Sequence, residues 1–277
     1  MLATLLIVFR EAIEAGLIVG IVLAATRGVA RRGLWISLGV GVGALGACVV
    51  AAFADRIATL FGGSGQALFN AVVLAVAVAM LTWHNVWMAS HGRAMARDVR
   101  RLGTEVQSGE RPLAALAVVC AAAVMREGSE VALFLYGVAA AGGVTAPAML
   151  LGGVLGLLGG AGMSTLMFFG LLRIPAHRFF AATSGLITLL AAGLASQAVN
   201  FLQQAGYFEV GTSTLWNTSW LLSDNSLGGR LGHTLVGYTA QPSAAQFAVY
   251  LATIAGILGL TWMVRHAPTL DGRPAAG

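Results

Sequence analysis

The chain has 277 residues, of which 58% are hydrophobic and only 10% are charged. A soluble domain carries about 25% charged residues, so this composition, with a mean hydropathy of +0.83, indicates a polytopic membrane protein surrounded by the lipid bilayer. The net charge is +5, but all 16 basic residues are arginines, and 14 of them lie between the apolar runs or at their ends. That pattern excludes a nucleic acid partner, which would require a basic surface interleaved with aromatic residues.

Seven apolar segments follow one another along the chain, each near or above the ~20 residues that span a bilayer. A spanning segment must satisfy its own backbone hydrogen bonds, so we expect each to be a helix and the fold to be all-α. The first lacks a basic leader and a cleavage site, which favours a retained helix over a signal peptide. One transmembrane domain over 1–265 is expected. The segments are 2–26, 34–54, 66–90, 113–140, 146–172, 177–199 and 246–265.

The placement of arginine predicts the orientation of the chain. With the N-terminus outside, the inner segments hold 12 arginines and the outer ones hold only two, Arg56 and Arg230. Cytoplasmic loops carry an excess of basic residues, so we predict an N-out, C-in topology. Residues 91–112 then form a solvated helical inner loop, residues 200–245 an outer loop, and residues 266–277 a cytoplasmic tail.

Two parts of the chain repeat each other. The stretch FREAIEAGLIVGIVLA at 9–24 aligns without gaps on MREGSEVALFLYGVAA at 125–140, and the same offset of 116 pairs Gly43 with Gly159 and Gly46 with Gly162. The first repeat covers about 1–90 and the second about 113–199. Each contains three spans, so the second crosses the membrane in the opposite sense. This predicts a 3+3 inverted repeat with a seventh helix, and a site near the midplane where the repeats meet.

Each repeat carries one R-E-x-x-E motif within an apolar helix. Residues three apart share a helix face, so the two glutamates of each motif face the same point. A charge at a helix centre costs on the order of 2.5–3.5 kcal/mol on insertion scales, so six charges in lipid indicate a function. The glutamates are the predicted metal ligands and the arginines tune their charge. The residues are Glu11, Glu14, Glu127 and Glu130, with Arg10 and Arg126.

The excess of acid over base indicates a bound cation. Four carboxylates and two guanidiniums leave a net charge of −2 when all are ionised, and oxygen ligands suit hard cations. Arg10 lies about 13 Å along the helix from Met1, near the middle of a ~30 Å hydrocarbon core. The competing interpretation is that Arg10, Glu11, Arg126 and Glu127 form interhelical salt bridges and nothing more.

Four further polar residues are secondary candidates. His84 and Asn85, in LTWHNVWM, lie late in the third span. A lone histidine there is either a hydrogen-bonded packing group, the more common case, or a ligand or proton relay. Glu209 and Asp224 in the outer segment either attract cations or are solvated loop acids.

The paired motifs, together with FLQQAGYF at 201–208 and LGHTLVGYTAQPSAAQ at 231–246, resemble the oxidase-dependent iron permease family of fungi and bacteria. The resemblance covers about 1–265. It implies inward iron transport at the inner (plasma) membrane, with the motif glutamates as iron ligands and iron as the substrate rather than a resident cofactor. It also implies a separate ferroxidase or periplasmic iron-binding partner. A homo-oligomer is left open.

Three rivals to an iron permease remain from the residues alone. The first is a transporter of another divalent cation such as lead or manganese. The second is an intramembrane enzyme acting on a lipid head group, although carboxylates at mid-depth fit such an enzyme poorly. The third is an anion transporter that uses Arg10 and Arg126, which the excess of glutamate disfavours. We therefore expect a permease and not an enzyme.

Overall fold

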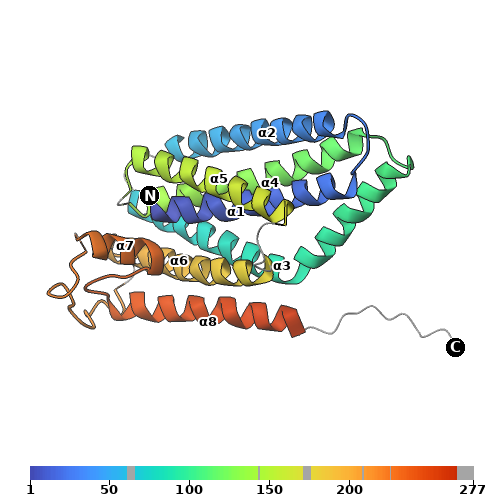
Figure 1. Ribbon diagram of the computed structural model, residues 1–277. Coiled ribbons are helices and arrows are strands. Elements are labelled where there is room, and N and C mark those ends of the chain that lie inside the picture. The colour runs from blue at the N-terminus through green and yellow to red at the C-terminus, as the bar shows by residue number, and fades with distance from the viewer. Residues whose placement is uncertain (61–65, 143, 171–175, 208, 225, 267–277) are drawn as a thin grey trace.

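The computed structural model describes the chain except residues 61–65, 143, 171–175, 208, 225 and 267–277. Over the described residues the protein is all-helical, without a strand, and most helices run along one common axis (Figure 1). The predicted tail 266–277 lies outside the described residues from position 267 onward. The helices are α1 Leu2–Ala25, α2 Arg32–Leu60, α3 Gln66–Gln107, α4 Ala114–Ala140, α5 Ala146–Phe168, α6 Ala176–Gln204, α7 Leu227–Val236 and α8 Ala244–His266.

Five helices are long and apolar enough to cross a membrane by length and composition. These stretches are Arg32–Phe53, Ala67–Ala89, Ala146–Phe168, Ala181–Gln204 and Ala244–Val264, in α2, α3, α5, α6 and α8. The helices α1 and α4, with 24 and 27 residues, are at least as long as these stretches. They differ from the other five because each carries one arginine and two glutamates near its middle.

Two helix pairs pack closely through glycine: α2 lies on α4, and α5 lies on α1. A Cβ atom on Gly43 would lie 2.6 Å from the carbonyl oxygen of Ala121, and one on Gly156 would lie 2.6 Å from that of Leu5. Ala121 follows Leu5 by 116 positions, whereas Gly156 follows Gly43 by only 113. The contact of Gly43 with α4 is therefore matched by the contact of Gly156 with α1, and not by Gly159, which the sequence offset pairs with Gly43.

The helix α3 does not end where the apolar pattern ends. It continues through most of the predicted inner loop 91–112 to Gln107, over 42 residues in total. Val99 and Val106 on this extension are buried in a cluster with Val22 of α1, and the Gln107 side chain donates to the Arg27 carbonyl at 3.2 Å. The predicted solvated loop is thus an extension of a membrane helix, packed on the end of α1.

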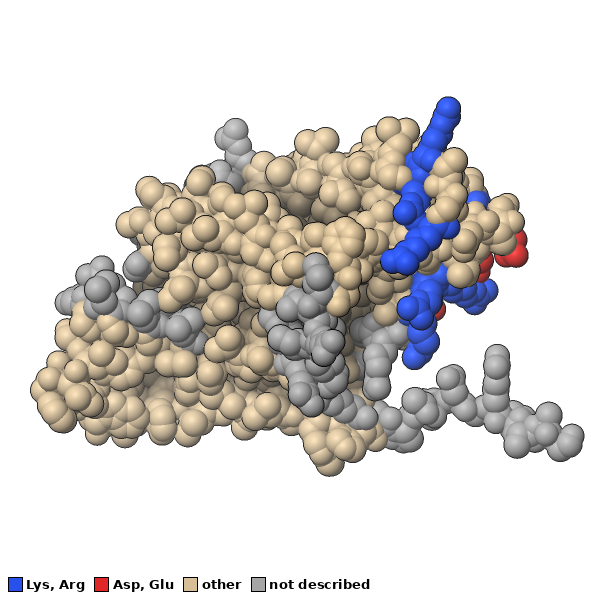
Figure 2. Space-filling model, viewed as in Figure 1, with Lys and Arg blue, Asp and Glu red and all other residues tan. Residues whose placement is uncertain are grey.

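Arginines gather at this end of the molecule. In Figure 2 the visible basic side chains form a band at one end and the remaining described surface in that view is almost free of charge. Arg101 and Arg111 both pair with Glu105, at 2.8 and 2.7 Å. Arg27, just after α1, and Arg97, in the extension of α3, are exposed. The charged residues therefore mark one of the two ends of the bundle.

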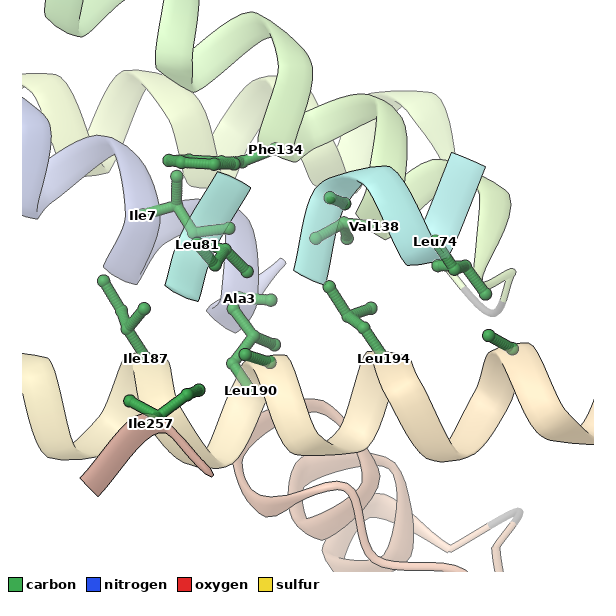
Figure 3. Close-up of a cluster of buried hydrophobic side chains, with 13 residues drawn as sticks. Ala3, Ile7, Leu74, Leu81, Phe134, Val138, Ile187, Leu190, Leu194 and Ile257 are labelled. Carbon is green, nitrogen blue, oxygen red and sulfur yellow. The ribbon is translucent and has the colours of Figure 1, made fainter. Parts of the chain in front are cut away.

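A cluster of apolar side chains fills the interior of the bundle around the N-terminal part of α1. Ile7, Leu81 and Phe134 are at most 1% exposed, and Figure 3 shows Ile7 and Leu81 beneath the ring of Phe134. Ile7 belongs to α1, Leu81 to α3 and Phe134 to α4. Each lies about one helical turn from a polar side chain of the same helix: Glu11, His84 and Glu130. We call the three apolar residues the apolar layer.

The segment 200–245 is folded rather than an open loop. The helix α6 extends to Gln204, and the short helix α7 ends at Gly237 in the left-handed conformation, with φ of 69°. Thr218 and Tyr238 share a hydrogen bond of 2.6 Å between their hydroxyl groups, and Tyr238 donates to the Leu222 carbonyl at 2.8 Å. These contacts tie the segment into a cap beside α6.

Candidate metal centre

The first motif lies on the buried face of α1. Glu11 and Glu14 point to the same side, as their spacing predicts, and Arg10 holds both. The Arg10 guanidinium lies 3.2 Å from Glu11 Oε1 and 2.9 Å from Glu14 Oε1. All three side chains are nearly fully buried, at 1–3% exposure. The motif on α1 is therefore a sealed arrangement with one base between two acids.

The second motif, on α4, is more open. Glu127 is buried, but the side chains of Glu130 and Arg126 are 17% and 33% exposed. Arg126 Nε lies 3.1 Å from Glu130 Oε1 and 3.8 Å from Glu127 Oε1. Its guanidinium carbon is 4.1 Å from the centre of the Trp87 ring on α3. The arginine of this motif thus forms the edge of the site, at the side away from the apolar layer.

The two motifs meet where α1, α3 and α4 pack together. Four side chains each offer one ligand atom, and these atoms all lie within 4.8 Å of one another. Three come from the motifs: Glu11, Glu127 and Glu130. The fourth is His84 of α3. Glu14, which the sequence predicts as an equal partner, is not in this set, although its Oε2 atom lies 3.5 Å from His84 Nε2.

The imidazole of His84 lies among the carboxylates. Its Nδ1 atom contacts Glu130 Oε2, and its Nε2 atom is 3.5 Å from Glu14 Oε2 and 3.7 Å from Glu11 Oε2. The side chain is 3% exposed, and its ring meets Phe134 of the apolar layer edge-on. The apolar pattern alone placed His84 near the end of a span, but α3 continues for 23 residues beyond it, which puts the imidazole in the helix interior.

Many buried polar atoms of this cluster have no hydrogen-bond partner within the described chain. A carboxylate oxygen without a donor is costly in a low-dielectric interior, and four carboxylates face only two guanidiniums. A bound cation would satisfy these acceptors and balance their charge. The atoms are Glu11 Oε2, Glu14 Oε2 and both carboxylate oxygens of Glu127.

Comparison with known proteins identifies the family of the chain. The model of the Iron permease FTR1 family matches residues 1–266. This chain belongs to the iron permease FTR1 family. It is a multi-pass membrane protein, and its family indicates a transporter rather than an enzyme. No solved structure gives a significant match.

Relatives of this FTR1 family member include ferrous iron permeases of Escherichia coli and Yersinia pestis. The ferrous iron permease EfeU of Escherichia coli O6:H1 is 32% identical, covering 90% of this chain and 91% of the relative. EfeU of Escherichia coli O157:H7 is 31% identical over the same shares. EfeU of Yersinia pestis is 29% identical, covering 90% of this chain and 89% of the relative.

The other secondary candidates in this FTR1 family member lie outside the cluster. Asn85 donates to the Ser184 carbonyl at 3.2 Å and to Thr188 Oγ1 at 3.0 Å, so it fastens α3 to α6. Asp224 accepts a hydrogen bond of 2.9 Å from the Ala240 amide, within the segment that caps α6. Glu209 is exposed.

Proposed function

We propose that this protein imports iron across the inner membrane, and that the ion passes through the cluster of motif glutamates. The observation that carries the proposal is the convergence of three buried or half-buried carboxylates from two R-E-x-x-E motifs, with oxygens that lack donors. Family membership supplies the substrate class, and relatives named as ferrous iron permeases support iron in particular.

The proposed architecture is a 3+3 inverted repeat followed by α8. Its support is the exchange of partners between the halves, since α2 packs on the motif helix α4 and α5 packs on the motif helix α1. The contacts also correspond in register: Gly39 faces Ala117, and Gly152 faces Met1. The correspondence fails for the third helices, because α3 brings His84 to the site and α6 packs mainly on α3 and α8.

The proposed orientation puts the N-terminus outside and the arginine-rich end inside. Basic residues are retained on the cytoplasmic side of membrane proteins, and the band of arginines in Figure 2 supports this assignment. The apolar layer then separates the site from the outside, and Arg126 lies on the inward side. Iron would be shared among Glu11, Glu127 and Glu130 while Arg10 holds Glu14. Inward release would follow from movement of one repeat against the other.

The proposal is tested by replacing single ligands without changing their size. We expect Glu11→Gln and Glu130→Gln to lower uptake of radioactive Fe²⁺ into proteoliposomes by more than about 10-fold, the scale on which metal sites respond to loss of a supporting group. Glu110→Gln, an exposed acid in the link between α3 and α4, serves as the matched control. Near-normal uptake by both site variants, at equal reconstitution, would refute the proposal.

The same assay separates iron from the rival substrates. Excess Mn²⁺ or Pb²⁺ is added to the outside, and uptake of labelled iron is followed. We expect iron to outcompete both metals. Stronger inhibition by one of them than by unlabelled iron would make that metal the preferred substrate.

A further inference from the structure

His84 is the one member of the four-atom donor set that stands outside the motifs. It is the one residue that α3 contributes to this set, and the other three come from α1 and α4. Its Nε2 atom faces Glu11 and Glu14 of α1, and its Nδ1 atom contacts Glu130 of α4. The imidazole therefore lies between the two motif helices.

Other histidines in the described part of the chain are held by the backbone. The Nδ1 atom of His233 lies 2.9 Å from the Tyr238 carbonyl, and that of His266 lies 2.9 Å from the Trp262 carbonyl. His84 has no such carbonyl contact among the described residues. Its ring nitrogens face carboxylates instead: Nδ1 contacts Glu130 Oε2, and Nε2 lies 3.5 Å from Glu14 Oε2 and 3.7 Å from Glu11 Oε2. A histidine retained for packing needs a single hydrogen-bond partner, whereas this imidazole lies among carboxylates of two helices that offer oxygen atoms to the same point.

We propose that His84 is a metal ligand and that it sets the selectivity of the site for a divalent first-row transition ion, such as Fe²⁺, over Ca²⁺ and Mg²⁺. The inference rests on the proposed function, since it takes the glutamate cluster as the transport site. It adds a nitrogen donor to a set that the motifs alone would make entirely of oxygen.

The chemistry of the donors gives the direction of this selectivity. Carboxylate, carbonyl and water oxygens suit Mg²⁺ and Ca²⁺, whereas imidazole suits iron, nickel, copper and zinc. Ca²⁺ takes six to eight oxygen ligands, often including backbone carbonyls. Here the ligands come from the interiors of α1, α3 and α4, where the carbonyls are engaged in helical hydrogen bonds. A compact site with one nitrogen therefore disfavours the hard ions.

The first experiment measures selectivity with His84→Asn and His84→Leu in proteoliposomes. For the unmodified chain we expect excess Ca²⁺ or Mg²⁺ to leave Fe²⁺ uptake almost unchanged. In both variants we expect the concentration of Ca²⁺ that halves iron uptake to fall by about 10-fold or more, the lower end of the effect of disturbing a metal site. His266→Asn on α8 is the matched control. Unchanged inhibition by Ca²⁺ in both variants would overturn the inference.

The second experiment detects the ligand without transport. Mn²⁺ is added to purified protein whose histidines carry ¹⁵N, and electron spin-echo envelope modulation is recorded. We expect a coupling from an imidazole nitrogen in the unmodified chain and in His266→Asn. We expect His84→Asn to lose that coupling. Bound Mn²⁺ with no coupling in the unmodified chain, or with coupling kept in His84→Asn, would contradict a ligand role.

The two proposals fail in different ways. If both Glu11→Gln and Glu130→Gln transport iron normally, the proposed function falls, and the inference falls with it. If Glu11→Gln is inactive while His84→Asn and His84→Leu keep both uptake and selectivity, the glutamates remain the transport site and only the role of His84 is refuted. Melting curves of each variant in detergent show whether a loss reflects unfolding.

Discussion

The two motif arginines differ in what surrounds them. Arg10 is 1% exposed and lies between Glu11 and Glu14, whereas Arg126 is 33% exposed and stacks on Trp87. A fully buried pair that loses one partner leaves an uncompensated charge, while solvent screens a pair at the edge. Arg10 is therefore a fixed structural counter-charge, and Arg126 is a group that an ion leaving the site would pass.

This difference predicts unequal effects on stability. Arg10→Leu leaves two buried glutamates without their base, and we expect it to destabilise the protein by about 3–5 kcal/mol. We expect Arg126→Leu to cost about 1 kcal/mol or less, because its pairs are partly solvated. Thermal unfolding in one detergent measures both.

A double variant provides the control. Adding Glu14→Gln to Arg10→Leu removes one of the stranded charges, so the melting temperature should partly recover. Equal losses for the two arginine variants, or no recovery in the double variant, would contradict the assigned roles.

At the scale of helices, glycine permits the close approach of each motif helix to its partner. A Cβ atom on Gly160 of α5 would lie 2.6 Å from the Ala12 Cβ atom and 2.7 Å from the Phe9 carbonyl oxygen. A Cβ atom on Gly162, two positions later, would have no neighbouring atom within 4 Å. Small residues drive such packing in lipid, where apolar surface alone gives no preference between protein and lipid. The positions of these glycines thus fix how α1 presents its glutamates.

The pair of glycines gives a matched test of this packing. Gly160→Ala must displace a backbone contact of α1, and overpacking of this kind costs about 1–3 kcal/mol. Gly162→Ala is expected to be neutral. Melting temperature and iron uptake are measured for both. A Gly160→Ala protein that matches Gly162→Ala in both measurements would show that the two helices are not in close contact.

At the scale of the whole molecule, charge is distributed unevenly along the axis of the bundle. Arginines band one end, while the segment between α6 and α8 presents exposed aromatics such as Trp220, which is 82% exposed. Basic ends face the cytoplasm and tryptophans favour the membrane–water interface. The arginines support the proposed orientation, whereas tryptophans are enriched at both interfaces and do not distinguish the two ends.

Accessible cysteines test that orientation. Cys48 and Cys120, both free, are first replaced by alanine. We expect Thr212→Cys, in the segment before α7, to react with a membrane-impermeant maleimide in intact cells. Ser108→Cys, after α3, should react only in inverted vesicles. The reverse pattern would invert the proposed topology.

Much of this organisation is readable from the sequence because lipid allows few alternatives. Apolar length locates the start of each long helix to within a few residues, and spacing places Glu11 and Glu14 on one face. The sequence offers His84 only as a secondary candidate late in the third span, because hydropathy ends that span near residue 90 while the helix itself ends at Gln107. It also does not separate Glu14 from Glu11. That distinction depends on the three-dimensional geometry of side chains that all come from different turns and helices.

The apolar layer of Ile7, Leu81 and Phe134 has an electrical consequence. A thin, water-free barrier is where most of a transmembrane voltage drops, since conducting water on either side holds little field. Each unit charge gains about 2.3 kcal/mol per 100 mV, so a divalent ion that crosses the whole barrier toward a negative interior gains about 4.6 kcal/mol per 100 mV. In the proposed orientation, the voltage would therefore act mainly on the step that brings the ion past these three side chains to the proposed site.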